Sequence, residues 1–143
     1  MLDLPKSPSG SLCPYYYLGG ELHPLKYGSY GTDHERLRAV VMAEQEFILA
    51  SRGTHNRRVW VNLYDTALDR ATITMLIEHL VAIRPKILKL CLVGCSGWDR
   101  HRVRAAMRLL SPDLYATTRY FGDPEEAKRW LIGTRTDRGA GSV

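Results

Sequence analysis

Residues 87–104, ILKLCLVGCSGWDRHRVR, decide how this chain folds. The first seven residues are apolar except for Lys89, which is typical of a strand buried on both faces of a parallel sheet. Gly94 and Gly97 then allow a tight turn. An arginine-rich segment from about Trp98 to Leu110 follows with the spacing of a helix. The stretch therefore predicts one strand, one loop and one helix in direct succession.

Similar patterns alternate on both sides of this unit. The remaining strands are expected at 15–18, 21–27, 58–63 and 116–120, with a turn at Gly19-Gly20 between the first two. The remaining helices are expected from a cap at Thr32 or Asp33 to Gly53, at 70–83 after a cap at Asp69, and from a cap at Asp123 to Gly133. Because helices between strands act as crossover connections, the sequence predicts an α/β fold. Its sheet is mostly parallel, is built of alternating βα units and follows an N-terminal β-hairpin.

The chain of 143 residues has the length of one domain. Pro, Ser and Gly at 1–13 predict a flexible arm, and the polar, glycine-containing 134–143 predict a disordered tail. A single domain is therefore expected over 14–133.

Composition excludes several classes of protein. Twenty Lys and Arg against 15 Asp and Glu give a net charge of +5, but the basic clusters are short and aromatic residues do not alternate with them, so nucleic-acid binding is not favoured. We find neither a signal peptide nor an apolar run of about 18 residues, and we expect no membrane insertion. Three cysteines without disulfide or zinc spacing favour a reducing, cytoplasmic location and no metal or other cofactor.

Polar residues follow the strands where parallel sheets commonly bind ligands. Cys95 stands before a helix N-terminus, where the helix dipole lowers the pKa of a thiol. A thiol phosphatase needs five residues between its cysteine and arginine, whereas Arg100 leaves four and Arg102 leaves six. Two readings remain: a turn whose arginines face water, which we favour, or a weak anion site. The candidate ligand-binding residues are Asp65, Thr66, Gly94, Cys95, Ser96, Gly97 and Arg100, and no catalytic set is identified among them.

Two helices carry apolar stripes. Glu44 lies on or beside the stripe of the first helix, and we expect it at the edge, reaching water. Val81 belongs to the expected buried face of 70–83, and Trp60 to the core. Candidate partner-surface residues are Tyr15, Tyr16 and Tyr17 at a sheet edge and Trp98 at a loop tip, where an exposed anchor and a lid over the sheet are both open.

Three strings resemble the small SpoIIAA-like proteins of the STAS superfamily. They are VWVNLYDT (59–66), KLCLVGCSG (89–97) and RYFGDPEEAKRWL (119–131), and the similarity covers about residues 25–132. The resemblance implies a non-enzymatic domain with a βα core, of a kind that includes anti-sigma-factor antagonists and regulatory domains of transporters. Such antagonists carry a phosphorylated serine or threonine after an aspartate. Aligned on Asp65 that position is Thr66, a possible phosphoacceptor; aligned on Asp69 it is Arg70, which a kinase for serine and threonine cannot modify.

The resulting hypothesis is a non-enzymatic regulatory or protein-binding domain of STAS type, with a protein partner. The alternative is a small-molecule or anion-binding domain, or an enzyme, that uses the loops at the carboxyl ends of the parallel strands. A homodimer formed through the N-terminal hairpin is a further expectation, since edge strands can pair between copies.

Overall fold

A computed structural model describes residues 15–17, 20–26, 33–50, 57–64, 66–95 and 97–133. The predicted arm at 1–13 and the predicted tail at 134–143 lie outside the described residues. The elements are β1 (Tyr15–Tyr17), β2 (Gly20–Lys26), α1 (His34–Leu49), β3 (Arg57–Asn62), α2 (Arg70–Ile83), the 3₁₀ turn η1 (Arg84–Lys86), β4 (Ile87–Val93), α3 (Gly97–Leu110), α4 (Pro112–Thr117), β5 (Arg119–Phe121) and α5 (Pro124–Ile132).

Strands β2, β3, β4 and β5 form a parallel sheet in which spatial neighbours follow in chain order. At least one helix separates each strand from the next, so the predicted α/β class with parallel βα units is confirmed. The short β1 pairs antiparallel with β2, with Tyr15 opposite Leu22. Residues 18 and 19, on which part of the predicted turn falls, lie outside the described residues.

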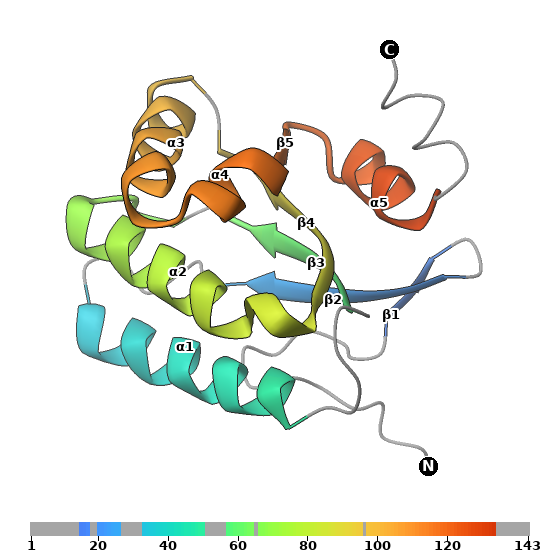
Figure 1. The fold of residues 1–143 in the computed structure, drawn as a ribbon, viewed down its shortest axis with the longest axis horizontal. Coiled ribbons are helices and arrows are strands. Elements are labelled where there is room, and N and C mark those ends of the chain that lie inside the picture. Colours follow the sequence, from blue (N-terminus) through green and yellow to red (C-terminus); the bar gives the residue numbers. More distant parts are fainter. Residues whose placement is uncertain are drawn as a thin grey trace.

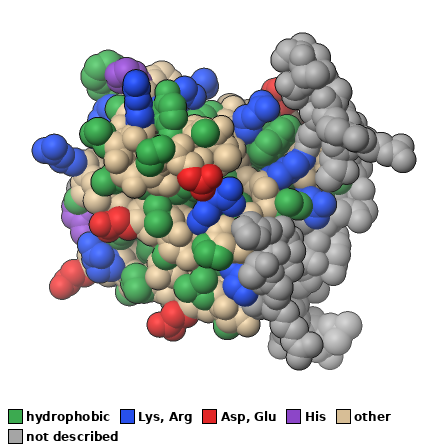
Figure 2. Space-filling view, in the orientation of Figure 1, with side chains coloured by type: hydrophobic (Ala, Val, Ile, Leu, Met, Phe, Trp, Pro, Cys, Tyr) green, Lys and Arg blue, Asp and Glu red, His purple; other side chains and the backbone are tan. Residues whose placement is uncertain are grey.

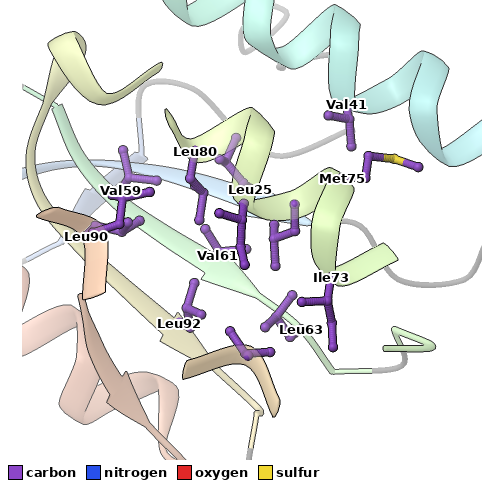
Figure 3. Close-up of a cluster of buried hydrophobic side chains, with 14 of the residues drawn as sticks. Leu25, Val41, Val59, Val61, Leu63, Ile73, Met75, Leu80, Leu90 and Leu92 are labelled. Atoms are coloured by element: carbon purple, nitrogen blue, oxygen red, sulfur yellow. The ribbon is translucent and has the colours of Figure 1, made fainter. Parts of the chain in front are cut away.

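The helices form two unequal layers on the sheet (Figure 1). Helices α1, α2, α3 and α4 contribute to the larger apolar cluster on one face, whereas α5 packs on the other face. Strand β4 contributes side chains to both clusters. Leu90 and Leu92 belong to the larger one (Figure 3). Cys91 and Val93 belong to the smaller one, which also includes Leu131 of α5. The prediction that this strand is buried on both faces is therefore confirmed.

Predicted helix caps are also confirmed. The carboxylate of Asp33 accepts a hydrogen bond from the backbone N–H of Arg36, and the carboxylate of Asp69 accepts one from Thr72. Asp123 caps α5, with Pro124 in its first turn. Each side chain satisfies a donor that the first turn of a helix leaves open, so these positions mark where the helices begin.

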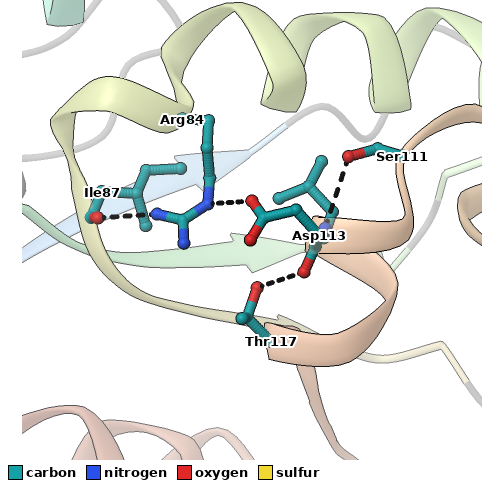
Figure 4. A network of polar contacts seen from close by, with 6 residues as sticks. Arg84, Ile87, Ser111, Asp113 and Thr117 are labelled. Carbon is teal, nitrogen blue, oxygen red and sulfur yellow. Dashed lines mark hydrogen bonds and ion pairs between the residues drawn. The ribbon is translucent and has the colours of Figure 1, made fainter.

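The predicted strand 116–120 is wrong in its first half, because residues 112–117 form α4 and β5 begins only at Arg119. The hydroxyl of Ser111 accepts a hydrogen bond from the N–H of Leu114, and Pro112 occupies the first turn. Asp113 adds an ion pair to Arg84, with 2.6 Å between carboxylate and guanidinium (Figure 4). Ser-Pro-Asp is a helix start signal that outweighs the strand preference of the following residues.

The expectations for the burial of Glu44 and Val81 are wrong, and the expectation for Trp60 holds only in part. Glu44 does not reach water but is fully buried, with its Oε1 3.9 Å from Nε2 of His23 on β2. Val81 is exposed instead of buried, and Trp60 is half-buried against the smaller cluster. Glu44 shares the buried stripe of α1 with Val41 and Ile48 and contacts β2, so tertiary packing and not the local spacing decides which edge of a stripe is covered.

The buried His79 predicts that acid destabilises the fold. Burial lowers the pKa of His79 to about 4 from an ordinary 6.5, an effect to which His23 adds and which Glu44 partly opposes. Between these pH values the unfolded chain binds the proton more tightly, so stability falls as pH drops through this range, by about 3 kcal/mol from this residue.

Urea unfolding at pH 7, 6, 5 and 4 measures the effect. In His79→Leu, stability should vary less with pH over the same range, whereas the exposed control His101→Gln should behave like the unmodified chain. An unchanged pH dependence in His79→Leu would show that other groups cause the acid sensitivity.

Candidate functional site

The loops at the carboxyl ends of β3, β4 and β5 are joined by hydrogen bonds to one another. The N–H of Leu63 donates to the carbonyl of Val93 at 2.8 Å, and the N–H of Gly94 donates to the carbonyl of Phe121 at 3.2 Å. The hydroxyl of Tyr64 donates to the carbonyl of Gly122. Three loops that are far apart in the chain are thus brought together at this rim of the sheet.

Position 94 requires glycine, because its backbone has a positive φ and Tyr64 lies against it. Its φ is +87°, and a Cβ added there would lie 2.8 Å from the ring of Tyr64 and 2.9 Å from the backbone nitrogen of Tyr64. Gly97 also has a positive φ, +56°, but has open space where a Cβ would be. The aromatic ring of Tyr64 therefore takes up the space above the Gly94 backbone.

Cys95 is buried in the larger apolar cluster and is not presented to solvent. Burial raises the pKa of its thiol to about 11; Asp99 adds to the increase and Arg100 partly opposes it. The thiol is thus protonated at neutral pH, the unreactive form. Arg100 is exposed, and its guanidinium carbon lies 5.9 Å from the ring centroid of Tyr120.

The structure brings some of the predicted ligand-binding residues together and leaves others undescribed. Gly94, Cys95, Gly97 and Arg100 lie within seven residues of one another, between the end of β4 and the first turn of α3, whereas Asp65 and Ser96 lie outside the described residues. The N–H of Gly94 is already donated to Phe121, so it is not presented to an anion. The anion site stays a prediction.

Thr66 lies beside a small void and not in an open pocket. Its hydroxyl donates to the carbonyl of Tyr64 at 3.4 Å, and the void of about 10 Å³ that it lines is otherwise apolar, apart from Thr72. Phosphorylation of Thr66 stays a prediction.

Sequence reasoning missed the contact between His34 and Asp69. The Nε2 atom of His34 lies 2.8 Å from the carboxylate of Asp69 and joins the N-termini of α1 and α2. The hydrogen bond from Thr72 and the contact with His34 hold the pKa of Asp69 below its usual value. Asp69 was identifiable as a helix cap, but no local pattern indicates a partner 35 residues away.

Trp98 lies in the first turn of α3, not at a loop tip, and its exposure shows that it is not a lid over the sheet. It is 74% exposed and stacks on His101 with 5.4 Å between ring centroids. It stands at one end of a groove of about 560 Å³ between α2 and α3, which we call the α2–α3 groove. The lining residues are Arg70, Ile73, Thr74, Trp98, His101, Arg102, Ala105, Ala106, Leu109 and Leu110.

Sequence analysis did not identify the other apolar members of this groove. Leu109 is 85% exposed and Leu110 is 52% exposed, although both are large and apolar. The sequence signal for their exposure was their position at the end of the predicted helix, just before Ser111-Pro112. The side chains of Tyr15, Tyr16 and Tyr17, the other predicted partner surface, are outside the part of the chain whose side chains are described.

The described ranges contain no cluster of three or more His, Cys, Asp or Glu side chains that could hold a metal ion. None of their helices combines the length and the apolar character that a membrane span requires.

Comparison of the chain with protein-family models, curated proteins and solved structures finds no match.

The close approach at Gly94 predicts that Gly94→Ala destabilises the fold by about 2–4 kcal/mol, because strain at positive φ and the contact with Tyr64 act together. Gly97→Ala introduces the positive-φ strain but no contact with Tyr64, so it should lower the stability by about 1 kcal/mol. Gly122→Ala, with open space around it, should be nearly neutral. Chemical denaturation of the three variants measures the differences; equal losses at Gly94 and Gly97 would show that the Tyr64 contact is unimportant.

Burial of Cys91 and Cys95 predicts slow alkylation by iodoacetamide in the native protein at pH 8. With Cys13 replaced by serine, the two remaining thiols should react at least about tenfold more slowly than in urea-unfolded protein. Mass spectrometry of timed samples follows the reaction. Rapid native labelling of Cys95 would show a reactive thiol and reopen the catalytic alternative.

Proposed function

We propose that this chain is a non-enzymatic regulatory domain of STAS type whose α2–α3 groove binds an acidic amphipathic helix of a partner protein. The observation that carries the proposal is the exposure of Trp98, Leu109 and Leu110 along one groove. Large apolar side chains are costly to leave in water, and a concentration of them on a surface marks an interaction site. Tryptophan in particular is enriched among residues that dominate binding energy.

The groove has the dimensions of a short helix. Trp98, Arg102, Ala105 and Leu109 follow one another at helical spacing along α3, so they form one stripe. Eleven residues separate its ends, which corresponds to about 16 Å, or three turns. A partner helix of about three turns with apolar residues at positions i, i+4, i+7 and i+11 could cover the whole stripe.

The charges of the groove select an acidic partner. Two arginines and a histidine line it, and no Asp or Glu is among its described lining residues. The guanidinium of Arg102 is held in place by the carbonyl of Leu68 at 2.7 Å and by Asp99 at 3.5 Å. Arg70 stands at the first turn of α2 and is exposed. Figure 2 shows hydrophobic and basic side chains gathered at the upper left, over α3.

A second copy of the chain fits this groove less well. It would bring the same arginines and the same histidine to the contact, and the lining of the groove offers no carboxylate to neutralise them. Like charges brought together at an interface disfavour association. We therefore assign the groove to a different protein.

The STAS assignment is supported by the arrangement of the βα units. The resemblance implies a βα core, and the four parallel strands succeed one another in chain order with helices between them. The closing string RYFGDPEEAKRWL, which carries most of the resemblance, forms β5 and α5. The antiparallel pairing of β1 with β2 supports the expected N-terminal hairpin, and a reducing, cytoplasmic location remains part of the proposal.

A binding site at the rim, the alternative function, has less support. The backbone groups of Leu63 and Gly94 form hydrogen bonds with neighbouring loops. Tyr64 fills the space above Gly94, and the thiol of Cys95 is buried and protonated. What distinguishes the groove is that three of its large apolar side chains, Trp98, Leu109 and Leu110, remain exposed.

A peptide-display selection tests the proposal. Random 16-residue peptides are selected on the unmodified chain and then counter-selected on the Trp98→Ala/Leu109→Ala variant. We expect enrichment of acidic peptides with apolar residues at helical spacing, bound at least about tenfold more weakly by the variant because its anchors are missing.

Leu88→Ala is the matched control, since Leu88 is exposed and apolar but lies on β4, outside the groove. It should bind the selected peptides normally. Circular dichroism should show that all variants remain folded, because the substituted side chains are exposed. The proposal fails if no peptide is enriched, if the enriched peptides are basic, or if the double variant binds them as tightly as the Leu88→Ala control.

A further inference from the structure

A second side of α3 carries a row of arginines. Arg100, Arg104 and Arg108 follow one another at intervals of four residues, and all three are exposed. Residues at this interval lie one above another on a helix, so the three form a line about 12 Å long, which we call the arginine stripe. None of the three lines the α2–α3 groove. Helix α3 therefore presents two different surfaces.

Two tyrosines from later elements hold the first two arginines of the stripe in place. The guanidinium carbon of Arg104 lies 5.2 Å from the ring centroid of Tyr115 on α4 and 5.6 Å from that of Tyr120 on β5. The guanidinium carbon of Arg100 lies 5.9 Å from the same Tyr120 ring. The hydroxyl of Tyr120 in turn donates to the sulfur of the buried Met107 at 3.5 Å. Cation–π attraction acts over such distances, so a fixed ring orients both guanidinium groups.

The charge of the arginine stripe is not neutralised within the described part of the chain. None of the ion pairs described there involves Arg100, Arg104 or Arg108. The single carboxylate of α3, that of Asp99, lies 3.5 Å from Arg102, which belongs to the α2–α3 groove. Burial raises the pKa of Tyr120 to about 12, an effect that the two arginines oppose, so this phenol is uncharged at neutral pH. The stripe thus offers three positive charges to solvent.

The stripe offers little apolar area to a ligand. The large exposed apolar side chains of α3 are Trp98, Leu109 and Leu110, and all three line the α2–α3 groove instead. A bound peptide gains most of its affinity from a few large side chains in well-packed contacts. The backbone of a nucleic acid binds through its phosphates and needs no such area. The stripe therefore favours a nucleic acid over an acidic peptide.

The tyrosine contacts favour a single strand over a duplex. Each ring lies against its arginine from the side of α4 and β5, and the exposed guanidinium groups of Arg100 and Arg104 keep a face toward solvent. Unpaired bases stack on arginine planes, whereas the bases of a duplex are already stacked on one another. The local sequence does not indicate this combination, because both tyrosines come from elements beyond α3.

From these contacts we propose that the arginine stripe binds single-stranded nucleic acid, with its three guanidinium groups on phosphates of one strand. Guanidinium groups match the geometry of phosphate oxygens and can donate two parallel hydrogen bonds to them. Unpaired bases lie against the open faces of Arg100 and Arg104. The inference does not rest on the proposed function, because the stripe and the α2–α3 groove share no residue.

Fluorescence anisotropy with a labelled twelve-residue single-stranded oligonucleotide tests the proposal at several salt concentrations. Each phosphate contact contributes about −0.7 to the slope of log affinity against log salt, so we expect a slope of about −2 for the unmodified chain. Arg100→Gln/Arg104→Gln should bind at least about tenfold more weakly at low salt, with a slope of about −0.7. Arg108→Gln leaves both tyrosine contacts intact and should reduce the slope by about 0.7.

Arg38→Gln/Arg129→Gln is the matched control, since it makes the same change in net charge on exposed positions of α1 and α5 and should bind like the unmodified chain. Further arms use the duplex form of the oligonucleotide and poly-glutamate as a competitor. The proposal is overturned if about 100 µM protein does not bind the single strand at low salt, or if the control loses affinity as Arg100→Gln/Arg104→Gln does. It is also overturned if Arg108→Gln keeps the full slope, if the duplex binds more tightly, or if poly-glutamate competes as well as unlabelled oligonucleotide at equal charge.

Discussion

Burial of β4 on both faces is the constraint on which the rest of this structure depends. Leu90 and Leu92 need one apolar layer, and Cys91 and Val93 need another on the opposite side. Helices α1 to α4 supply the first layer and α5 the second, and a central position in the parallel sheet follows because both neighbouring strands complete the hydrogen bonds of β4. Since strands β2 to β5 are parallel, their carboxyl ends meet at one rim, which places the loop after β4 beside those after β3 and β5.

That rim is where parallel sheets usually bind ligands, yet in this chain the rim is stabilised by its own contacts. The backbone groups of Leu63 and Gly94 are paired across neighbouring loops, and Tyr64 closes over Gly94. Large exposed apolar side chains lie elsewhere, and Trp98, Leu109 and Leu110 line the α2–α3 groove. The α2–α3 groove offers apolar area with a few cations beside it, which suits a helix that buries one stripe and presents carboxylates.

The sequence by itself determined the order of the elements, the α/β class and the beginnings of most helices. Those features depend on signals within about ten residues: the apolar run of β4, the caps Asp69 and Asp123, and Gly133 at the end of α5. Only the tertiary structure decided that Glu44 is buried, that Trp98 and Leu109 stay exposed, and that Arg58 stands opposite Lys89. The physical reason is that burial and strand register depend on which distant element packs against a residue, and no local spacing encodes that neighbour.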